Sequence, residues 1–180
     1  MTVVKSDVVK KLMDAKKFLL QGYLDEGVKI VKEVVNSLSS QGQQEQYNWL
    51  ICNVIESIDC RYMFDVLEQI GSYFDLSKCQ NLKNVVECGI INNSDNKYVD
   101  LALDILVSQG KRDRIEELAR DALKNQDISG ELLVKIAQAL KKVGNERDAV
   151  LLLNEACKKG VKEACSNVIV PPTSAGRGVM

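Results

Sequence analysis

The sequence predicts an all-α protein of about nine to ten antiparallel helices with no β-sheet. Three observations lead to this fold class. Proline occurs only twice in 180 residues, at Pro171 and Pro172, so no proline interrupts a helix before that point. Apolar residues recur at the i, i+3, i+4 and i+7 spacing of an amphipathic helix, and no segment shows sustained strand alternation. Glycines follow several of these segments, at positions typical of a helix end.

The first helix is predicted from Asp7 to Gln21. Ser6 is expected to cap its N-terminus, and Gly22 stands where a left-handed residue commonly ends a helix. The apolar side of this helix is a stripe with spacings of four, three and four residues, made of Val8, Leu12, Ala15 and Leu19.

The same combination of stripe and capping residue predicts the later helices. They are expected over residues 24–38, 44–58, 61–74, from Asp75 or Ser77 to Ile91, after Ser94 as far as Gly110, 112–125, after Ser129 as far as Gly144, 146–159 and 161–169. Pro171 and Pro172 end the last helix. Residues 1–170 are therefore predicted to form a single helical-repeat domain, and residues 171–180 a flexible C-terminal tail.

Three of the predicted turns share one pattern. Gly22 and Gly110 stand three residues, and Gly144 two residues, before an acidic residue that opens the next helix, and Gly110 and Gly144 are 34 residues apart. Apolar or small residues then recur in register, as Gly27, Val31 and Val34, as Ile115, Ala119 and Ala122, and as Ala149, Leu153 and Ala156. Repeated hairpins of this kind favour a stack of helix pairs over a closed bundle.

These residues resemble the tetratricopeptide repeat, whose period is about 34 residues. The turn glycines match Gly22, Gly110 and Gly144, and the small residues of the repeat match Ala15, Ala122, Ala137, Ala149 and Ala156. The resemblance covers residues 8–38 and 96–162 well and residues 43–74 poorly, so an uncharacterised family with degenerate repeats is an equal alternative. It implies a right-handed α-α superhelix, or solenoid, in which the helix around residues 76–91 is an insertion.

In tetratricopeptide scaffolds the first helix of each pair lines a concave groove. The resemblance therefore implies a set of candidate binding residues on three predicted helices, namely Leu12, Lys16, Leu20, Lys97, Asp100, Asp104, Val134, Gln138 and Lys141.

The aromatic residues leave two interpretations open. Six aromatic residues between positions 47 and 74, including Trp49, indicate either core packing of the second helix pair or an anchor pocket for a partner.

The six cysteines leave two interpretations open. Cys52 and Cys60, like Cys157 and Cys165, are eight positions apart across a predicted helix junction, a separation that can bring Cα atoms within disulfide range. The spacing also resembles cysteine-rich relatives of the tetratricopeptide repeat, which implies the disulfides Cys52–Cys60 and Cys157–Cys165. The alternative is six buried thiols, because cytosolic thiols are normally reduced outside hyperthermophiles, and 22 Asn and Gln residues disfavour such a source.

The composition argues against catalysis and against metal or cofactor binding. Histidine is absent, which excludes catalytic triads, Cys-His dyads and His-ligated metals, and there is no C-x-x-C motif or phosphate-binding glycine loop. The net charge is −1 overall, with −6 over residues 41–110 between +2 before and +3 after this segment. This distribution lacks the basic excess that is typical of a nucleic-acid binder.

The sequence therefore predicts a non-enzymatic scaffold that presents a helical groove to a protein or peptide, with no cofactor and no small-molecule substrate. Two alternatives remain: an RNA-binding helical-repeat protein, motivated by the basic residues after position 110, and a self-associating protein or homodimer that packs through Val168–Val170. No secretion signal or membrane span is visible, so a cytoplasmic location is expected.

Overall fold

The computed structural model describes residues 5–166, and these residues contain ten α-helices, two 3-10 helices and no strand. The all-α prediction is thus confirmed for this part of the chain. The elements are α1 (Ser6–Leu20), α2 (Leu24–Ser40), η1 (Gln44–Tyr47), α3 (Asn48–Glu56), α4 (Met63–Ile70), η2 (Leu76–Lys78), α5 (Lys83–Ile91), α6 (Lys97–Ser108), α7 (Arg112–Lys124), α8 (Gly130–Lys142), α9 (Glu146–Lys158) and α10 (Lys162–Ser166). The predicted tail 171–180 and the segment Val168–Val170 lie outside the described residues.

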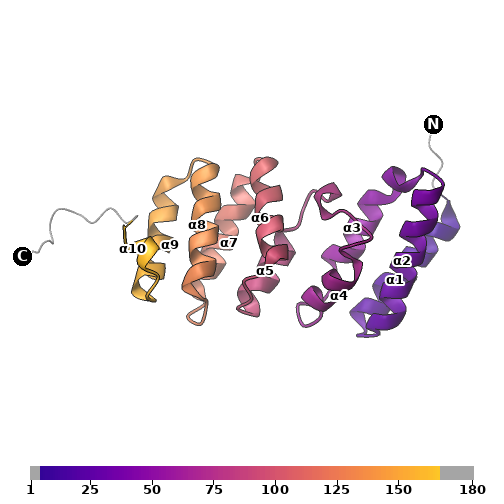
Figure 1. Cartoon of the computed structure of the whole chain (residues 1–180), viewed down its shortest axis with the longest axis horizontal. Helices are drawn as coiled ribbons and strands as arrows, with labels where there is room; N and C mark the ends of the chain where they lie inside the picture. Colours follow the sequence, from indigo (N-terminus) through magenta and orange to yellow (C-terminus); the bar gives the residue numbers. More distant parts are fainter. Residues whose placement is uncertain (1–4, 167–180) are drawn as a thin grey trace, which may run out of the picture.

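The helices follow one another in chain order along the longest axis of the molecule (Figure 1). Consecutive helices reverse direction and alternate between two layers. The odd-numbered layer is held by contacts between α1 and α3, α5 and α7, and α7 and α9. A disulfide between Cys60, just after α3, and Cys88 of α5 joins the two parts of this layer.

The even-numbered layer is built in the same way. Helix α2 packs on α4, and α6 packs on α8. The Tyr98 hydroxyl of α6 donates to Glu68 Oε2 of α4 at 2.7 Å, which connects the two halves of the layer. Apolar side chains from both layers form one continuous core that extends from Leu12 to Ala164.

Glycine ends several helices with the backbone conformation that the repeated turn pattern requires. Gly22, Gly110 and Gly144 have φ values of +86°, +65° and +87°, in the left-handed region that is unfavourable for residues with a side chain. The sequence prediction of tight turns at these three positions is confirmed.

Two predicted helices are divided differently in the structure. The segment predicted as one helix over residues 44–58 begins as η1 and continues as α3. The segment predicted from Asp75 or Ser77 to Ile91 contains η2 and, after an interruption, α5. The Asp75 carboxylate accepts the Ser77 N–H at 2.9 Å and starts η2, but Cys79 is extended and lies in a disulfide with Cys52, so the turn cannot continue as a helix.

The helix around residues 76–91, which the resemblance implies to be an insertion, is part of the stack as α5. Helix α5 is a regular member of the odd-numbered layer, since it is joined to α3 and packs on α7. Because four helices stand between α1 and α6, the alternation places α1 in one layer and α6 and α8 in the other. The candidate binding residues on these three helices therefore do not share one face.

The disulfides connect Cys52 with Cys79, Cys60 with Cys88, and Cys157 with Cys165, with Cα–Cα distances of 5.4, 4.9 and 4.8 Å. The predicted Cys52–Cys60 bridge is wrong. Cys52 lies buried within α3, whereas Cys60 lies in the turn beyond the end of that helix. Both cysteines of this hairpin instead reach the following segment, which contains η2 and α5. These two bridges therefore join successive hairpins, whereas Cys157–Cys165 joins the neighbouring helices α9 and α10.

Candidate functional site

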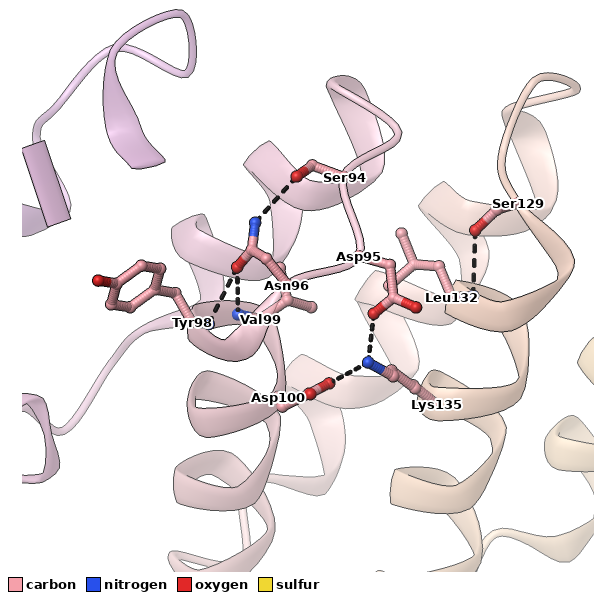
Figure 2. Close-up of polar contacts among 9 residues, drawn as sticks. All are labelled: Ser94, Asp95, Asn96, Tyr98, Val99, Asp100, Ser129, Leu132 and Lys135. Atoms are coloured by element: carbon pink, nitrogen blue, oxygen red, sulfur yellow. Dashed lines mark hydrogen bonds and ion pairs between the residues drawn. The ribbon is translucent and has the colours of Figure 1, made fainter. Parts of the chain in front are cut away.

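Two capping side chains, Asn96 and Ser129, begin the neighbouring helices α6 and α8 (Figure 2). Asn96 begins α6, and its Oδ1 accepts the N–H groups of Tyr98 at 2.9 Å and Val99 at 3.2 Å. Ser94, which was predicted for this role, instead contacts the Asn96 side chain. Ser129 caps α8 as predicted, since its hydroxyl accepts the Leu132 N–H at 3.2 Å.

Lys135 of α8 connects the two helices. Its Nζ lies 2.6 Å from Asp100 Oδ1 of α6 and also contacts the carboxylate of Asp95 before that helix, so both acidic side chains point to one ammonium group (Figure 2). Burial alone would lower the pKa of Lys135, but the hydrogen bonds and charges of Asp100 and Asp95 outweigh burial and raise the pKa above 10.5. Lys135 therefore stabilises the alignment of α6 with α8 while it is charged.

We expect Lys135→Met to lower the free energy of unfolding by about 1 kcal/mol, because two partly buried carboxylates lose their cation. The folded pKa is raised, so this contribution is fully present at neutral pH. It disappears as the pH rises above 10.5 and through the raised pKa. Urea unfolding at neutral and alkaline pH measures both effects. Lys142→Met is the matched control, since this exposed lysine makes no ion pair in the described part of the chain. Equal stability of the two variants would contradict the role of Lys135.

A cleft of about 330 Å³ runs between the same two helices, beside the Lys135 network. Leu103, Val107 and Ala139 form its apolar part. Asp100 and Asp104 lie on the α6 side, and Lys135, Gln138 and Lys142 lie on the α8 side. One wall is thus acidic and the other basic. Within residues 5–166, no ion pair or hydrogen bond engages the side chains of Asp104 and Lys142.

Three of the nine candidate binding residues line this cleft, namely Asp100, Asp104 and Gln138. On the same two helices, Val134 is half-buried against the core and Lys141 lies outside the cleft lining. Lys97 faces the other neighbour of α6, because its Nζ lies 3.5 Å from Glu68 Oε2 of α4.

The three candidates on α1 lie in the opposite layer. Leu12 is fully buried, so its prediction as a binding residue is wrong: it faces the core and cannot touch a partner. Lys16 donates to Asn53 Oδ1 of α3 at 3.0 Å, and Leu20 is about half exposed at the end of the helix. None of the three contributes to the cleft between α6 and α8.

Five residues that line the cleft were not among the predicted binding residues, namely Leu103, Val107, Lys135, Ala139 and Lys142. Their helical spacing was available, since each lies three or four positions from another lining residue of the same helix. The spacing alone does not specify how α8 is rotated about its own axis. In the structure this rotation turns residues 135, 138, 139 and 142 toward α6, whereas the prediction placed residues 134, 138 and 141 there.

The described residues provide neither a metal-binding group nor a membrane-spanning helix. Residues 5–166 contain no group of three or more Cys, Asp or Glu side chains arranged to hold a metal ion. Within the same range, every helix is too short or too polar to cross a bilayer.

A model of one protein family, the Domain of unknown function DUF1955, matches residues 7–170. The chain belongs to the DUF1955 family. The DUF1955 chain is also similar to the crystal structure of a hypothetical protein from the hyperthermophilic archaeon Sulfolobus tokodaii. The two sequences are 63% identical, the TM-score is 0.80, and the alignment covers 89% of this chain and 98% of that one. No curated protein matches the chain.

The Sulfolobus relative bears on the cysteines of this DUF1955 chain. Intracellular proteins of hyperthermophilic archaea are rich in disulfides, in contrast to those of mesophiles. In this chain all six cysteines are paired in three disulfides, so the alternative of six buried thiols is wrong.

Proposed function

We propose that this DUF1955 protein is a non-enzymatic scaffold that binds a segment of a partner protein in the cleft between α6 and α8. The observation that carries the proposal is an apolar strip between two charged side chains of opposite sign, Asp104 and Lys142, that no other described residue neutralises. Charges placed in this way give specificity and orientation to a protein ligand, whereas a polyanion requires a basic surface.

The cleft also defines the chemistry of the partner segment. A basic side chain of the partner faces Asp104, an acidic side chain faces Lys142, and an apolar side chain between them covers Leu103 and Val107. Because Lys135 and the two helix caps hold the walls in place before binding, the scaffold loses little conformational freedom on association.

Three finer features belong to the same proposal. The row of alternating helices supports a tetratricopeptide-like right-handed superhelix, in which α6 and α8 line a common groove. The three disulfides are compatible with the proposed cytoplasmic location, because intracellular proteins of hyperthermophilic archaea are rich in disulfides and the relative comes from such an organism. No cofactor, metal or small-molecule substrate takes part in the proposed binding.

The experiment is affinity capture of partners from native lysate with and without nuclease, followed by quantitative mass spectrometry. We expect discrete proteins to be retained after nuclease treatment by the wild-type protein. The double variant Asp104→Lys/Lys142→Glu should retain them at least about tenfold less, because both charges then repel the partner.

The opposite layer provides the matched control. A cleft of about 250 Å³ between α5 and α7 carries Asp121 and Lys124, so Asp121→Lys/Lys124→Glu introduces the same charge changes away from the proposed site. This control should capture the partners like the wild type. Loss of capture in the control alone would place the binding site between α5 and α7 and contradict the proposal. Loss of all capture on nuclease treatment would favour the RNA-binding alternative.

A further inference from the structure

The two disulfides that connect α3 with the segment containing η2 and α5 are shielded from solvent. Cys52, Cys79 and Cys88 are at most 5% exposed, and Cys60 is half-buried against the core. Thiol–disulfide exchange requires an attacking thiolate to reach a sulfur atom. The surrounding side chains therefore hinder exchange at both of these bridges.

The third disulfide has one accessible end. Cys165 of α10 is exposed, whereas its partner Cys157 of α9 is half-buried against the core. A thiolate from solvent is therefore best placed to attack the Cys165 sulfur, with the Cys157 sulfur behind it as the leaving group. Of the six cysteines, only Cys165 is an exposed residue.

The charge around the third disulfide favours an anionic reactant. The chain between its two cysteines carries three lysines and one glutamate, namely Lys158, Lys159, Lys162 and Glu163. Lys158 is offset by Glu155, because its Nζ lies 3.2 Å from Glu155 Oε1. Lys159 Nζ donates at 2.7 Å to the carbonyl oxygen of Gln126, an uncharged group that does not neutralise the ammonium. The remaining positive charge attracts an approaching thiolate.

The third disulfide holds a short helix at the end of the stack. Helix α10 has five residues, too few to be stable without tertiary contacts. Ala164 is buried, and Val161 just before the helix packs beside Gly130 of α8, in the space that a side chain there would occupy. Because the bridge closes a separation of only eight positions, the rest of the fold depends on it little.

We propose that the Cys157–Cys165 disulfide is a thiol–disulfide exchange site for a dithiol of a partner protein. Its reduction releases α10 from α9, whereas the Cys52–Cys79 and Cys60–Cys88 bridges stay closed and keep the remaining helices in place. The site is separate from the cleft between α6 and α8, so neither proposal depends on the other.

The reaction proceeds in two exchange steps. The first thiolate of the dithiol attacks Cys165 Sγ, the Cys157–Cys165 bond breaks, and the Cys157 sulfur leaves as a thiolate that takes a proton from water. The second thiolate of the dithiol then attacks its own neighbour in the mixed disulfide and releases Cys165 as a thiolate, which is also protonated. Two electrons pass to the cysteine pair, and the dithiol is oxidised to a disulfide.

The experiment is a time course of reduction on the oxidised, folded protein. The probe is reduced thioredoxin in excess, and free thiols are blocked with N-ethylmaleimide at successive times and located by peptide mass spectrometry. We expect Cys157 and Cys165 to become labelled at least about tenfold faster than the other four cysteines. Equal rates, faster labelling of Cys60 and Cys88, or no labelling at all would overturn the proposal.

The same time course in concentrated urea is the control for the role of the fold. Unfolding exposes all six cysteines, so we expect their labelling rates to become similar. A preference for Cys157 and Cys165 of the same size in urea would contradict an origin in burial.

A second measurement identifies the sulfur that is attacked. A thioredoxin variant whose second active-site cysteine is replaced by serine cannot complete the exchange, so the mixed disulfide accumulates. We expect thioredoxin to be bonded to Cys165. A bond mainly to Cys157 or to Cys60 would contradict the role of the exposed sulfur.

Hydrogen exchange measures the release of α10. After reduction by thioredoxin, we expect faster amide exchange in α10 and unchanged exchange in α5, as in the oxidised variant Cys157→Ala/Cys165→Ala. Unchanged exchange in α10 would overturn the release of the helix. Faster exchange in α5 would mean that the Cys60–Cys88 bridge had also opened, which contradicts selective reduction.

Discussion

Replacing Cys60 and Cys88 by alanine is expected to lower the free energy of unfolding by about 3–4 kcal/mol. The bridge closes a segment with a sequence separation of 28, and it restricts the unfolded chain accordingly. It also acts at a place where the fold has little regular structure, because the connection between α4 and α5 contains only the short turn η2. Urea unfolding of the oxidised wild type and the double variant measures the difference.

The effect should be local as well as global. With the bridge removed, two hydrogen bonds still join α5 and its C-terminal cap to the end of α3, since Asn84 and Asn92 donate to the carbonyl oxygens of Glu56 and Cys60, and the Cys52–Cys79 bridge still anchors the segment before α5. We therefore expect faster amide hydrogen exchange in η2 and α5 than in α8 and α9 of the same variant. Exchange that rises uniformly along the chain would argue against a role at this junction.

The third disulfide provides the control. Cys157 and Cys165 are only eight positions apart at the C-terminal end of the stack, so Cys157→Ala/Cys165→Ala should have a smaller effect, with faster exchange confined to α10. If the two double variants lost equal stability, loop length and position would not explain the contribution of the Cys60–Cys88 bridge.

The second large effect concerns Leu12. We expect Leu12→Ala to lower the free energy of unfolding by about 3 kcal/mol, because the side chain is fully buried between α1 and its neighbours and its truncation leaves a cavity. Urea unfolding followed by circular dichroism provides the measurement. Partner capture by the folded protein should not change, since Leu12 reaches no surface.

Leu20 on the same helix is the matched control. Its side chain is about half exposed, so Leu20→Ala should change the free energy of unfolding by no more than about 0.5 kcal/mol. A destabilisation equal to that of Leu12→Ala would mean that the two positions are equally buried in solution. That result would contradict the described orientation of α1.

The sequence by itself determined the local structure. The near absence of proline and the helical apolar spacing predicted the all-α class and most helix positions. Gly22, Gly110 and Gly144 predicted the hairpin turns. These features depend on a few neighbouring residues, whose backbone preferences act wherever the segment lies in the fold. Part of the cleft between α6 and α8 was also predictable, since Asp100, Asp104 and Gln138 were among the candidates.

The tertiary structure alone decided the layers, the cysteine partners and the composition of each cleft. Because the helices alternate between two layers, one additional helix moves every later helix to the other layer. For this reason α1 lies in a different layer from α6 and α8, although α1, α6 and α8 all resemble the first helix of a repeat. Cys52 and Cys60 bond to residues 27 and 28 positions away because α3 packs against η2 and α5. Leu12 and Leu20 belong to one helix, yet only packing with neighbouring helices buries one and exposes the other. Such contacts join segments far apart in the chain, and local spacing does not determine which of them meet.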